Sequence, residues 1–270
     1  ARRKKRVMVV GGGPAGLWAA KIAFLRGHEV SLYEKEEQTG GQVLIAMRGA
    51  GREEFGVIIR NEMNQLKRLN IPIVYGQLVT PDFVLELDPD AVIVATGSIP
   101  KRCPVSGADG PRVFNVIQVL KGEADIGEKV LFVDYDGHHR ATSTAEYLAE
   151  LRKAVHVITP SLFVGAELGP TQDLYLMRQR LLTKGVTFTP DFAVMEIRGT
   201  EIHGFNVYSN EWKVFEGFDT VVLAMGNEVE DSLYRALKGR VRELYRIGDC
   251  VAPRKVDMAI YEGYTVGNRV

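Results

Sequence analysis

The amino-acid sequence predicts an α/β protein with two similar units, each built on a parallel sheet. Near the N-terminus a glycine-rich turn joins an apolar strand to a helix, which is how such a unit begins. Unbroken apolar runs recur along the chain, as expected of parallel strands buried on both faces. Residues 219–226 also repeat residues 90–97 nearly position by position, which indicates two copies of one plan.

The composition bounds the size and class of the protein. A chain of 270 residues with 46% hydrophobic residues can bury a large core in one large or two small domains. The formal net charge is zero, and no apolar stretch approaches the ~18 residues of a membrane span. We therefore expect a soluble protein that binds neither nucleic acid nor a membrane. The basic run at residues 2–6 is interpreted as a solvated linker, because it has no aromatic neighbours.

Cysteine and histidine are too sparse for a redox pair or a metal centre. The two cysteines, Cys103 and Cys250, form no CxxC motif for a disulfide relay, and an iron–sulfur cluster typically takes four thiolates. Their scarcity fits a reducing cytoplasm, the expected location. His138 and His139 are chain neighbours, which seldom face one metal together, so we expect no metal site. The sequence lacks a secretory segment and an initiating Met, so we expect a piece of a longer chain or removal of the first Met.

The first unit opens with the strand at residues 7–10 and its glycine turn. Gly11 makes the tight turn, Gly13 lets the backbone approach a pyrophosphate, and Gly16 lets the helix pack on the strand. Free N–H groups at the helix N-terminus attract the anion. The next strand, residues 30–33, ends on Glu34, whose carboxylate can accept hydrogen bonds from an adenosine ribose. These parts in order predict an ADP-containing ligand here, against the alternative of a merely tight turn.

The rest of the first unit follows from periodicity. Apolar residues at helical spacing predict a helix over residues 55–69, and a short strand follows at residues 71–75. The apolar run at residues 91–95 predicts a central strand, after which Thr96 and Gly97 lie at the end where ligands bind in open α/β sheets.

The second unit begins near Val113. Strands are predicted at residues 130–133 and 155–158, each followed by an amphipathic helix, and a strand at 219–226 closes the unit. A last strand, residues 244–247, and a helix after Pro253 must join a sheet already started. We assign them to the first sheet, which gives a first domain of residues 1–110 and 226–270 and an inserted domain of residues 111–225.

A set of short motifs supports a more specific assignment. They are residues 11–20, Glu34, Gly40-Gly41-Gln42, Ala95-Thr96-Gly97, residues 223–226, Gly248-Asp249 and residues 259–263. In these motifs the chain resembles the C-terminal nucleotide-binding region of the trimethylamine dehydrogenase and 2,4-dienoyl-CoA reductase family, the NADH:flavin oxidoreductases that resemble Old Yellow Enzyme. The resemblance implies a glutathione-reductase-like fold of two Rossmann-like FAD/NAD(P)-binding domains, the second inserted in the first.

The resemblance also implies which residues bind FAD, or ADP in its place. The glycines hold the pyrophosphate, Glu34 and Lys35 border the ribose, Gln42 lies near the flavin edge, and Asp249 meets the pyrophosphate or the ribityl chain. A carboxylate between a strand and a helix can accept hydrogen bonds from a polyol, although it can also simply cap the helix. The full predicted set is Gly11, Gly13, Pro14, Ala15, Gly16, Glu34, Lys35, Gly41, Gln42, Val79, Ala95, Thr96, Gly97, Gly248 and Asp249.

Complete chains of the family begin with an FMN-bearing barrel and an iron–sulfur segment, and neither occurs in this sequence. The resemblance therefore places FMN, the iron–sulfur cluster and the substrate chemistry in an absent domain or partner subunit, and it implies an electron-transfer protein as a further partner. No catalytic residue is assigned to this chain.

The second unit departs from the pattern at its strand-to-helix turn. Asp134 and Asp136 stand where the first two glycines of a dinucleotide turn belong, and His139 replaces the third. A β-carbon there blocks close approach, and two carboxylates repel a pyrophosphate. No arginine follows the next strand to bind a 2′-phosphate, so direct NAD(P)H binding is disfavoured.

Three functions remain open at this point. The first is the FAD- or ADP-binding portion of a multicentre flavin oxidoreductase of the amine dehydrogenase or demethylase type. The second is an NAD(P)H-dependent flavin reductase in which His138 and Arg140 replace the glycine contacts. The third is a non-catalytic module in which ADP only braces the fold.

Overall fold

The computed structural model describes residues 3–270, so Arg2 of the basic run lies outside the described residues. The chain forms two compact units. Unit 1 comprises the residues up to Leu44, Glu54–Ile99 and Asn227–Val270, and unit 2 comprises Ile45–Glu53 and Pro100–Gly226. The main segment of unit 2 is therefore inserted in the sequence of unit 1.

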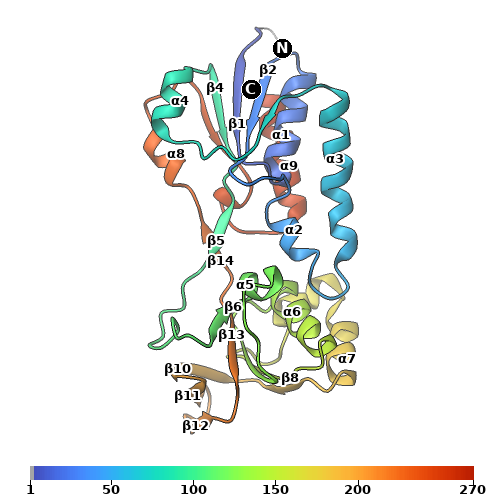
Figure 1. Cartoon of the computed structure of the whole chain (residues 1–270), viewed down its shortest axis with the longest axis vertical. Helices are drawn as coiled ribbons and strands as arrows, with labels where there is room; N and C mark the ends of the chain where they lie inside the picture. Colours follow the sequence, from blue (N-terminus) through green and yellow to red (C-terminus); the bar gives the residue numbers. More distant parts are fainter. Residues whose placement is uncertain (1–2) are drawn as a thin grey trace. The chain divides into compact units, whose positions relative to one another are not determined.

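Unit 1 is a five-stranded parallel sheet with helices on both faces (Figure 1). The strand order is β15 (Leu244–Arg246), β4 (Ala91–Val94), β1 (Arg6–Val10), β2 (Glu29–Tyr33) and β3 (Ile73–Val74). One face carries α1 (Pro14–Leu25), α3 (Gly56–Arg68) and α9 (Val256–Arg269), and the other carries α4 (Pro81–Leu87) and α8 (Ser232–Leu237). Since β15 pairs with β4 in parallel, the predicted return of the tail to the first sheet is confirmed.

The central strand β1 reads as an unbroken apolar run because both of its faces are covered. Val7 and Val9 pack in the cluster that includes α1, and Met8 and Val10 pack in the cluster that includes α4 and α8. Each of these four side chains is at most 5% exposed.

Helix α9 is held against α1 by small residues. A Cβ added at Gly263 would lie 2.4 Å from the carbonyl oxygen of Ala15, and one at Gly267 would lie 2.8 Å from Cβ of Ile22. The two helix backbones therefore approach closely at these glycines.

Unit 2 also contains a five-stranded sheet, in which four strands follow the arrangement of β4, β1, β2 and β3 in unit 1, and the fifth, an edge strand, comes first along the chain instead of last. Its parallel sheet runs β6 (Val113–Asn115), β13 (Thr220–Ala224), β7 (Lys129–Asp134), β8 (Ala154–Ile158) and β9 (Thr187–Thr189). The repeated segments at 90–97 and 219–226 form β4 and β13, the corresponding strands of the two sheets. Both are followed by a glycine with positive φ, +82° at Gly97 and +75° at Gly226. The predicted α/β class with two Rossmann-like units is confirmed.

The two faces of this second sheet are covered differently. The helices α5 (Val116–Lys121), α6 (His139–Glu150) and α7 (Leu174–Thr183) pack in one apolar cluster. The opposite cluster contains a three-stranded antiparallel sheet of β10 (Phe192–Arg198), β11 (Glu201–Asn206) and β12 (Trp212–Phe215). Shorter elements are α2 (Gln42–Ala46), η1 (Glu53–Phe55), η2 (Ala166–Thr171), η3 (Gly248–Cys250), and the paired strands β5 (Ser98–Pro100) and β14 (Asn227–Val229).

Two segments that the sequence analysis places in the first domain lie in unit 2. Residues 100–110 pack on β10, where the Ile197 N–H donates to the Ser106 carbonyl at 2.9 Å. Residues 45–53 pack on α5 and α6. The Arg48 guanidinium donates to the carbonyls of Leu120 and Lys121 at 3.3 Å, and the Ala50 N–H donates to the Ser143 carbonyl.

Among residues 3–270, no helix has the length and apolar character needed to cross a membrane. The same described residues contain no cluster of three or more His, Cys, Asp or Glu side chains suited to a metal ion.

Candidate functional site

Two glycines of the first turn are required by the protein itself. Gly11 has φ +108°, and a Cβ there would lie 2.3 Å from the carbonyl oxygen of Ala95. A Cβ on Gly16 would lie 1.9 Å from the carbonyl oxygen of Gly11. These distances allow only glycine where the turn meets β4 and where α1 crosses the turn.

Gly13 is different, because the described protein does not require it to be a glycine. It precedes α1 with an ordinary φ of −74°, and among residues 3–270 a Cβ would meet no atom within 4 Å beyond its chain neighbours. Pro14 begins the helix, and no side chain caps its N-terminus. The N-terminus of α1 therefore opens onto space into which a ligand can bring a negative charge.

Glu34 lies at the end of β2 with its carboxylate turned toward this turn. The side chain is buried, and its two oxygens accept hydrogen bonds from the Gly12 N–H at 2.7 Å and the Glu36 N–H at 2.9 Å. Each oxygen retains a lone pair, so the carboxylate can also accept from ribose hydroxyls. The Lys35 side chain is exposed, and its ammonium lies 3.9 Å from the Glu36 carboxylate.

A hydrogen-bonded network lies beyond the carboxyl ends of β4 and β15. The Gln42 amide donates to the Ser98 hydroxyl at 2.6 Å, the Asn227 amide donates to it at 2.9 Å, and this hydroxyl donates to the Asp249 carboxylate at 2.9 Å. Asn227 also donates to the Gln42 side-chain oxygen at 2.8 Å. Gly41 continues this group toward the glycine turn, since its Cβ would lie 3.4 Å from the Gly13 Cα.

Asp249 meets no cationic partner in this network. Besides Ser98 it accepts from the Arg254 backbone N–H at 3.1 Å, while the Arg254 guanidinium pairs with Glu262. The Gly248 N–H donates to the same Glu262 at 2.7 Å. A carboxylate in this setting suits the hydroxyl groups of a polyol better than a phosphate.

The structure gathers most of the predicted residues at one edge of unit 1. Ala95 contacts Gly11, Gly248 packs on Ala15, and Gln42 and Asp249 share the hydroxyl of Ser98. The Thr96 hydroxyl instead donates to the Glu230 carbonyl, and Val79 is buried in the core on the α4 side. The cofactor contacts of the whole set stay predictions.

Ser98 and Asn227 were not predicted from the sequence. Each directly follows a repeated motif: Ser98 comes after Ala95-Thr96-Gly97, and Asn227 comes after the matching Gly226. Their matching positions after the two repeats are the sequence signal that could have indicated these residues. The repeat alone does not predict that the two side chains lie close together.

The corresponding turn of unit 2 is filled by its own carboxylate. Asp134 is 1% exposed and accepts from the N–H groups of Asp136 at 3.0 Å and Gly137 at 2.7 Å. One oxygen of Asp134 and one of Asp136 are buried without a hydrogen-bond partner within residues 3–270. Burial, with the nearby charge of Asp136, raises the pKa of Asp134 to about 6.

A further segment covers this second turn. The Glu167 N–H donates to the Gly137 carbonyl at 3.2 Å, and a Cβ on Gly137 would lie 3.2 Å from Cγ of Glu167. The Asp136 and Gly137 N–H groups, which could otherwise face a phosphate, donate to Asp134 instead. The segment at Glu167 covers part of the turn.

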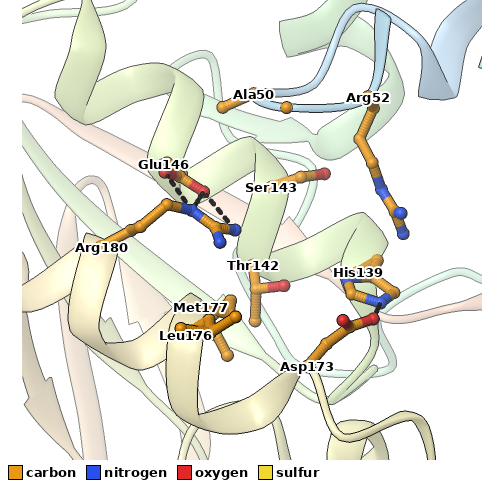
Figure 2. Close-up of a pocket in the computed structure, with 11 residues that line it drawn as sticks. Ala50, Arg52, His139, Thr142, Ser143, Glu146, Asp173, Leu176, Met177 and Arg180 are labelled. Carbon is orange, nitrogen blue, oxygen red and sulfur yellow. Dashed lines mark hydrogen bonds and ion pairs between the residues drawn. The ribbon is translucent and has the colours of Figure 1, made fainter. Parts of the chain in front are cut away.

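Unit 2 contains a separate pocket of about 170 Å³. Figure 2 shows the side chains that line it. The Glu146 carboxylate is buried there, and Arg180 donates to it at 2.9–3.2 Å. Burial alone would raise the pKa of Glu146, but the hydrogen bonds from Arg180 and Lys184 hold it below its usual value. His139 contacts Asp173 at 2.9 Å. The buried carboxylate is thus already paired, and none of the predicted cofactor residues lines this pocket.

Comparison with known proteins identifies the family. The chain matches the family described as pyridine nucleotide-disulphide oxidoreductase over residues 5–263. It belongs to this family. Membership makes the chain an oxidoreductase by class.

Individual relatives agree with the resemblance derived from the motifs. The chain is 30% identical to the N,N-dimethylglycine/sarcosine dehydrogenase of Chromohalobacter salexigens, over 97% of this chain and 43% of the relative. It is 32% identical to the NADH oxidase of Thermoanaerobacter brockii, over 97% of this chain and 40% of the relative. The resemblance to the trimethylamine dehydrogenase and 2,4-dienoyl-CoA reductase family is confirmed for this region.

Solved structures of similar proteins share the fold of this chain over nearly its whole length. A 2-naphthoyl-CoA reductase superposes with a TM-score of 0.93 at 30% identity, over 100% of this chain and 40% of that chain. Histamine dehydrogenase from Rhizobium sp. 4-9 superposes with a TM-score of 0.91 at 25% identity, over 99% of this chain and 44% of that chain. The chain thus spans about two fifths of the length of these relatives.

Proposed function

We propose that unit 1 binds FAD and that the chain is the flavin-nucleotide portion of a multicentre oxidoreductase of the amine dehydrogenase or demethylase type. The observation that carries the proposal is the contrast among the glycines of the first turn. Gly11 and Gly16 are fixed by contacts within the protein, whereas Gly13 faces open space at the N-terminus of α1. A pyrophosphate in that space explains a glycine that the packing does not require.

The contacts of the other residues favour a complete FAD over ADP. Asp249 retains acceptor capacity, lies near the neutral side chains of Ser98, Gln42 and Asn227, and forms no ion pair with any cation of residues 3–270 that could offset a phosphate charge. A ribityl chain would supply hydroxyl donors there, whereas ADP has no polyol to place beyond its pyrophosphate. Bound FAD would supply reversible two-electron storage, and the protein's share is to bind and orient it.

The substrate reaction is proposed to take place outside this chain. The relatives named as dehydrogenases are more than twice as long as the matched region, which leaves room for a domain or subunit bearing FMN and an iron–sulfur cluster. Unit 2 is proposed to bind no nicotinamide dinucleotide, because Asp134 engages donors of its turn.

A second candidate is an NAD(P)H-dependent flavin reductase, favoured by the relative named NADH oxidase. His138 and Arg140 would then have to bind the dinucleotide beside the buried Asp134 carboxylate. The two candidates differ in one observable, which is reduction of a bound flavin by NADH without oxygen.

The direct test is to identify the ligand that copurifies with the chain. The absorbance spectrum should show the two visible bands of an oxidised flavin, and mass spectrometry of the released ligand should give FAD. Release of ADP from a colourless protein would contradict the FAD assignment and support a structural nucleotide. Rapid anaerobic bleaching by NADH would support the flavin reductase instead.

A further inference from the structure

The hydroxyl of Ser98 uses all of its hydrogen-bonding capacity within unit 1. A hydroxyl has one donor and two acceptor positions. Ser98 donates to Asp249 at 2.9 Å and accepts from Gln42 at 2.6 Å and from Asn227 at 2.9 Å. The Gln42 amide is further fixed by the Ser98 carbonyl at 3.0 Å. One hydroxyl thus joins four chain segments: the start of α2, β5, β14 and η3.

This arrangement has a direction. Both acceptor positions of the hydroxyl are occupied by amide N–H groups, so its own proton is directed toward Asp249. The opposite carboxylate oxygen is held by the Arg254 backbone N–H at 3.1 Å. The Asp249 carboxylate is therefore held at both oxygens, and its rotation about the side-chain bond is restricted. The acceptor positions that remain have a fixed direction, a form of preorganisation that reduces the free energy lost on binding.

We propose that Ser98 is a positioning residue for the bound flavin nucleotide and acts through Asp249 and Gln42. The inference rests on the proposed function of unit 1. The hydroxyl fixes the direction in which the Asp249 carboxylate accepts hydrogen bonds from the polyol part of the ligand, and it holds the Gln42 amide beside it. Ser98 itself needs no contact with the ligand.

Removing the hydroxyl has a defined consequence. In Ser98→Ala the Gln42 and Asn227 amides each lose one acceptor, while Gln42 keeps the Ser98 carbonyl and Asn227 keeps the Gln42 side-chain oxygen. Asp249 loses the hydroxyl donor and keeps the backbone N–H of Arg254. Binding must then order a carboxylate that the hydroxyl no longer fixes, and ordering one side chain weakens binding by up to about tenfold. We expect the dissociation constant for FAD to rise by about tenfold, while Ser98→Thr, which keeps a hydroxyl, restores most of the affinity.

The experiment is titration of FAD into the apoprotein of the full chain, with melting temperatures measured with and without ligand. Ser232→Ala is the matched control, because the Ser232 hydroxyl contacts only Glu230 in the described structure and lies outside the network. Ser98→Ala should weaken FAD binding while the melting temperature of its apoprotein stays close to that of the control. Equal losses of apoprotein stability and of affinity would indicate a merely structural serine and overturn the inference.

A double-mutant cycle tests whether Ser98 acts through Asp249. If it does, S98A should weaken FAD binding much less in a D249N background than in the unmodified protein. Additive effects would overturn the inference. If S98A does not fold, N227A replaces it in the same cycle, since it removes a donor to the same hydroxyl. Failure of the unmodified chain to bind FAD would contradict the proposed function itself. Unchanged FAD affinity in S98A and N227A would contradict only the role of Ser98.

Discussion

At the scale of single residues, the glycines of the first turn separate requirements of folding from requirements of binding. A Cβ on Gly11 would meet the Ala95 carbonyl at 2.3 Å, and the backbone there is left-handed. Around Gly13 the described protein leaves space. The same pattern of glycines in the sequence therefore serves two purposes, which only the coordinates distinguish.

Gly11→Ala is expected to destabilise unit 1 whether or not a ligand is bound. Positive φ and the clash with a backbone oxygen together should cost about 2–4 kcal/mol of unfolding free energy. The measurement is chemical denaturation of the apoprotein, with Gly169→Ala as the control. Within residues 3–270 a Cβ on Gly169 would meet no atom within 4 Å beyond its chain neighbours and its own helix backbone, and Gly169 has no positive φ. Equal stability of the two variants would contradict the strain assigned to Gly11.

Asp134 makes the stability of unit 2 depend on pH in an unusual direction. Its pKa is about 6 in the folded protein against 3.8 for the ordinary carboxyl group, so the folded state favours the protonated form. The associated stability is present below about pH 4, falls as pH rises through about 6, and stays lost above that. Asp134→Asn, which keeps an oxygen acceptor for the two N–H groups, should raise the stability at neutral pH by about 1–3 kcal/mol.

The check is a series of melting temperatures between about pH 4 and pH 8 for the unmodified protein and for Asp134→Asn. The variant should gain most above pH 6 and little near pH 4. A variant that is less stable at neutral pH, or one whose gain does not change with pH, would show that the carboxylate is not strained by burial.

At the scale of elements, the two strand-to-helix turns have opposite properties. The turn after β1 leaves the N-terminus of α1 open, and the turn after β7 places the Asp134 carboxylate against N–H groups of its own backbone.

The unmodified chain should show no saturable NADH or NADPH binding at sub-millimolar concentrations. Changing Asp134 and Asp136 together to Gly removes both carboxylates and frees the donors, so weak NADH binding is the expected gain. Calorimetric titration with NADH measures the affinity of the unmodified chain and of the double variant. Tight NADH binding by the unmodified chain would contradict the proposal that unit 2 binds no nicotinamide dinucleotide.

The parallel strands and long helices could be predicted because their hydrophobic patterns are strong. The antiparallel sheet of β10, β11 and β12 could not, and no element was predicted between residues 186 and 218. Its pairing is interrupted by a bulge between Val194 and Glu196, which breaks the alternation of period two, and Trp212 and Val214 are apolar yet exposed. Residues 45–53 were assigned to the first domain because they lie between its elements in the sequence. Their hydrogen bonds to α5 and Ser143 place them in unit 2.

The motifs of the candidate site could be predicted from the sequence, whereas the hydrogen bonds that join its side chains could not. Glycines, Glu34 and Asp249 are recognisable because each has a known task at a known place in the fold. Ser98 and Asn227 are ordinary polar residues in sequence, and only the approach of β5, β14 and η3 makes them partners of Asp249.

At the scale of the whole molecule, the two units share the arrangement of four strands and differ at their strand-to-helix turns. The strands β4, β1, β2 and β3 of unit 1 correspond to β13, β7, β8 and β9 of unit 2, whereas the remaining edge strand comes last along the chain in unit 1 (β15) and first in unit 2 (β6). The fold thus provides two candidate edges for a dinucleotide, and side chains at the turns decide between them. We propose that the cofactor binds to unit 1 alone.

The most direct test of that claim is the affinity of the apoprotein for FAD in Gly13→Ala, compared with Gly169→Ala and the unmodified chain. A Cβ at Gly13 fits the protein without a clash in the described structure, so the apoprotein should keep its melting temperature. The added group would nevertheless lie where the pyrophosphate must approach. We predict that FAD binding weakens by at least about tenfold, a loss of about 1.4 kcal/mol. Unchanged FAD affinity in Gly13→Ala would contradict the assignment of the cofactor to this turn.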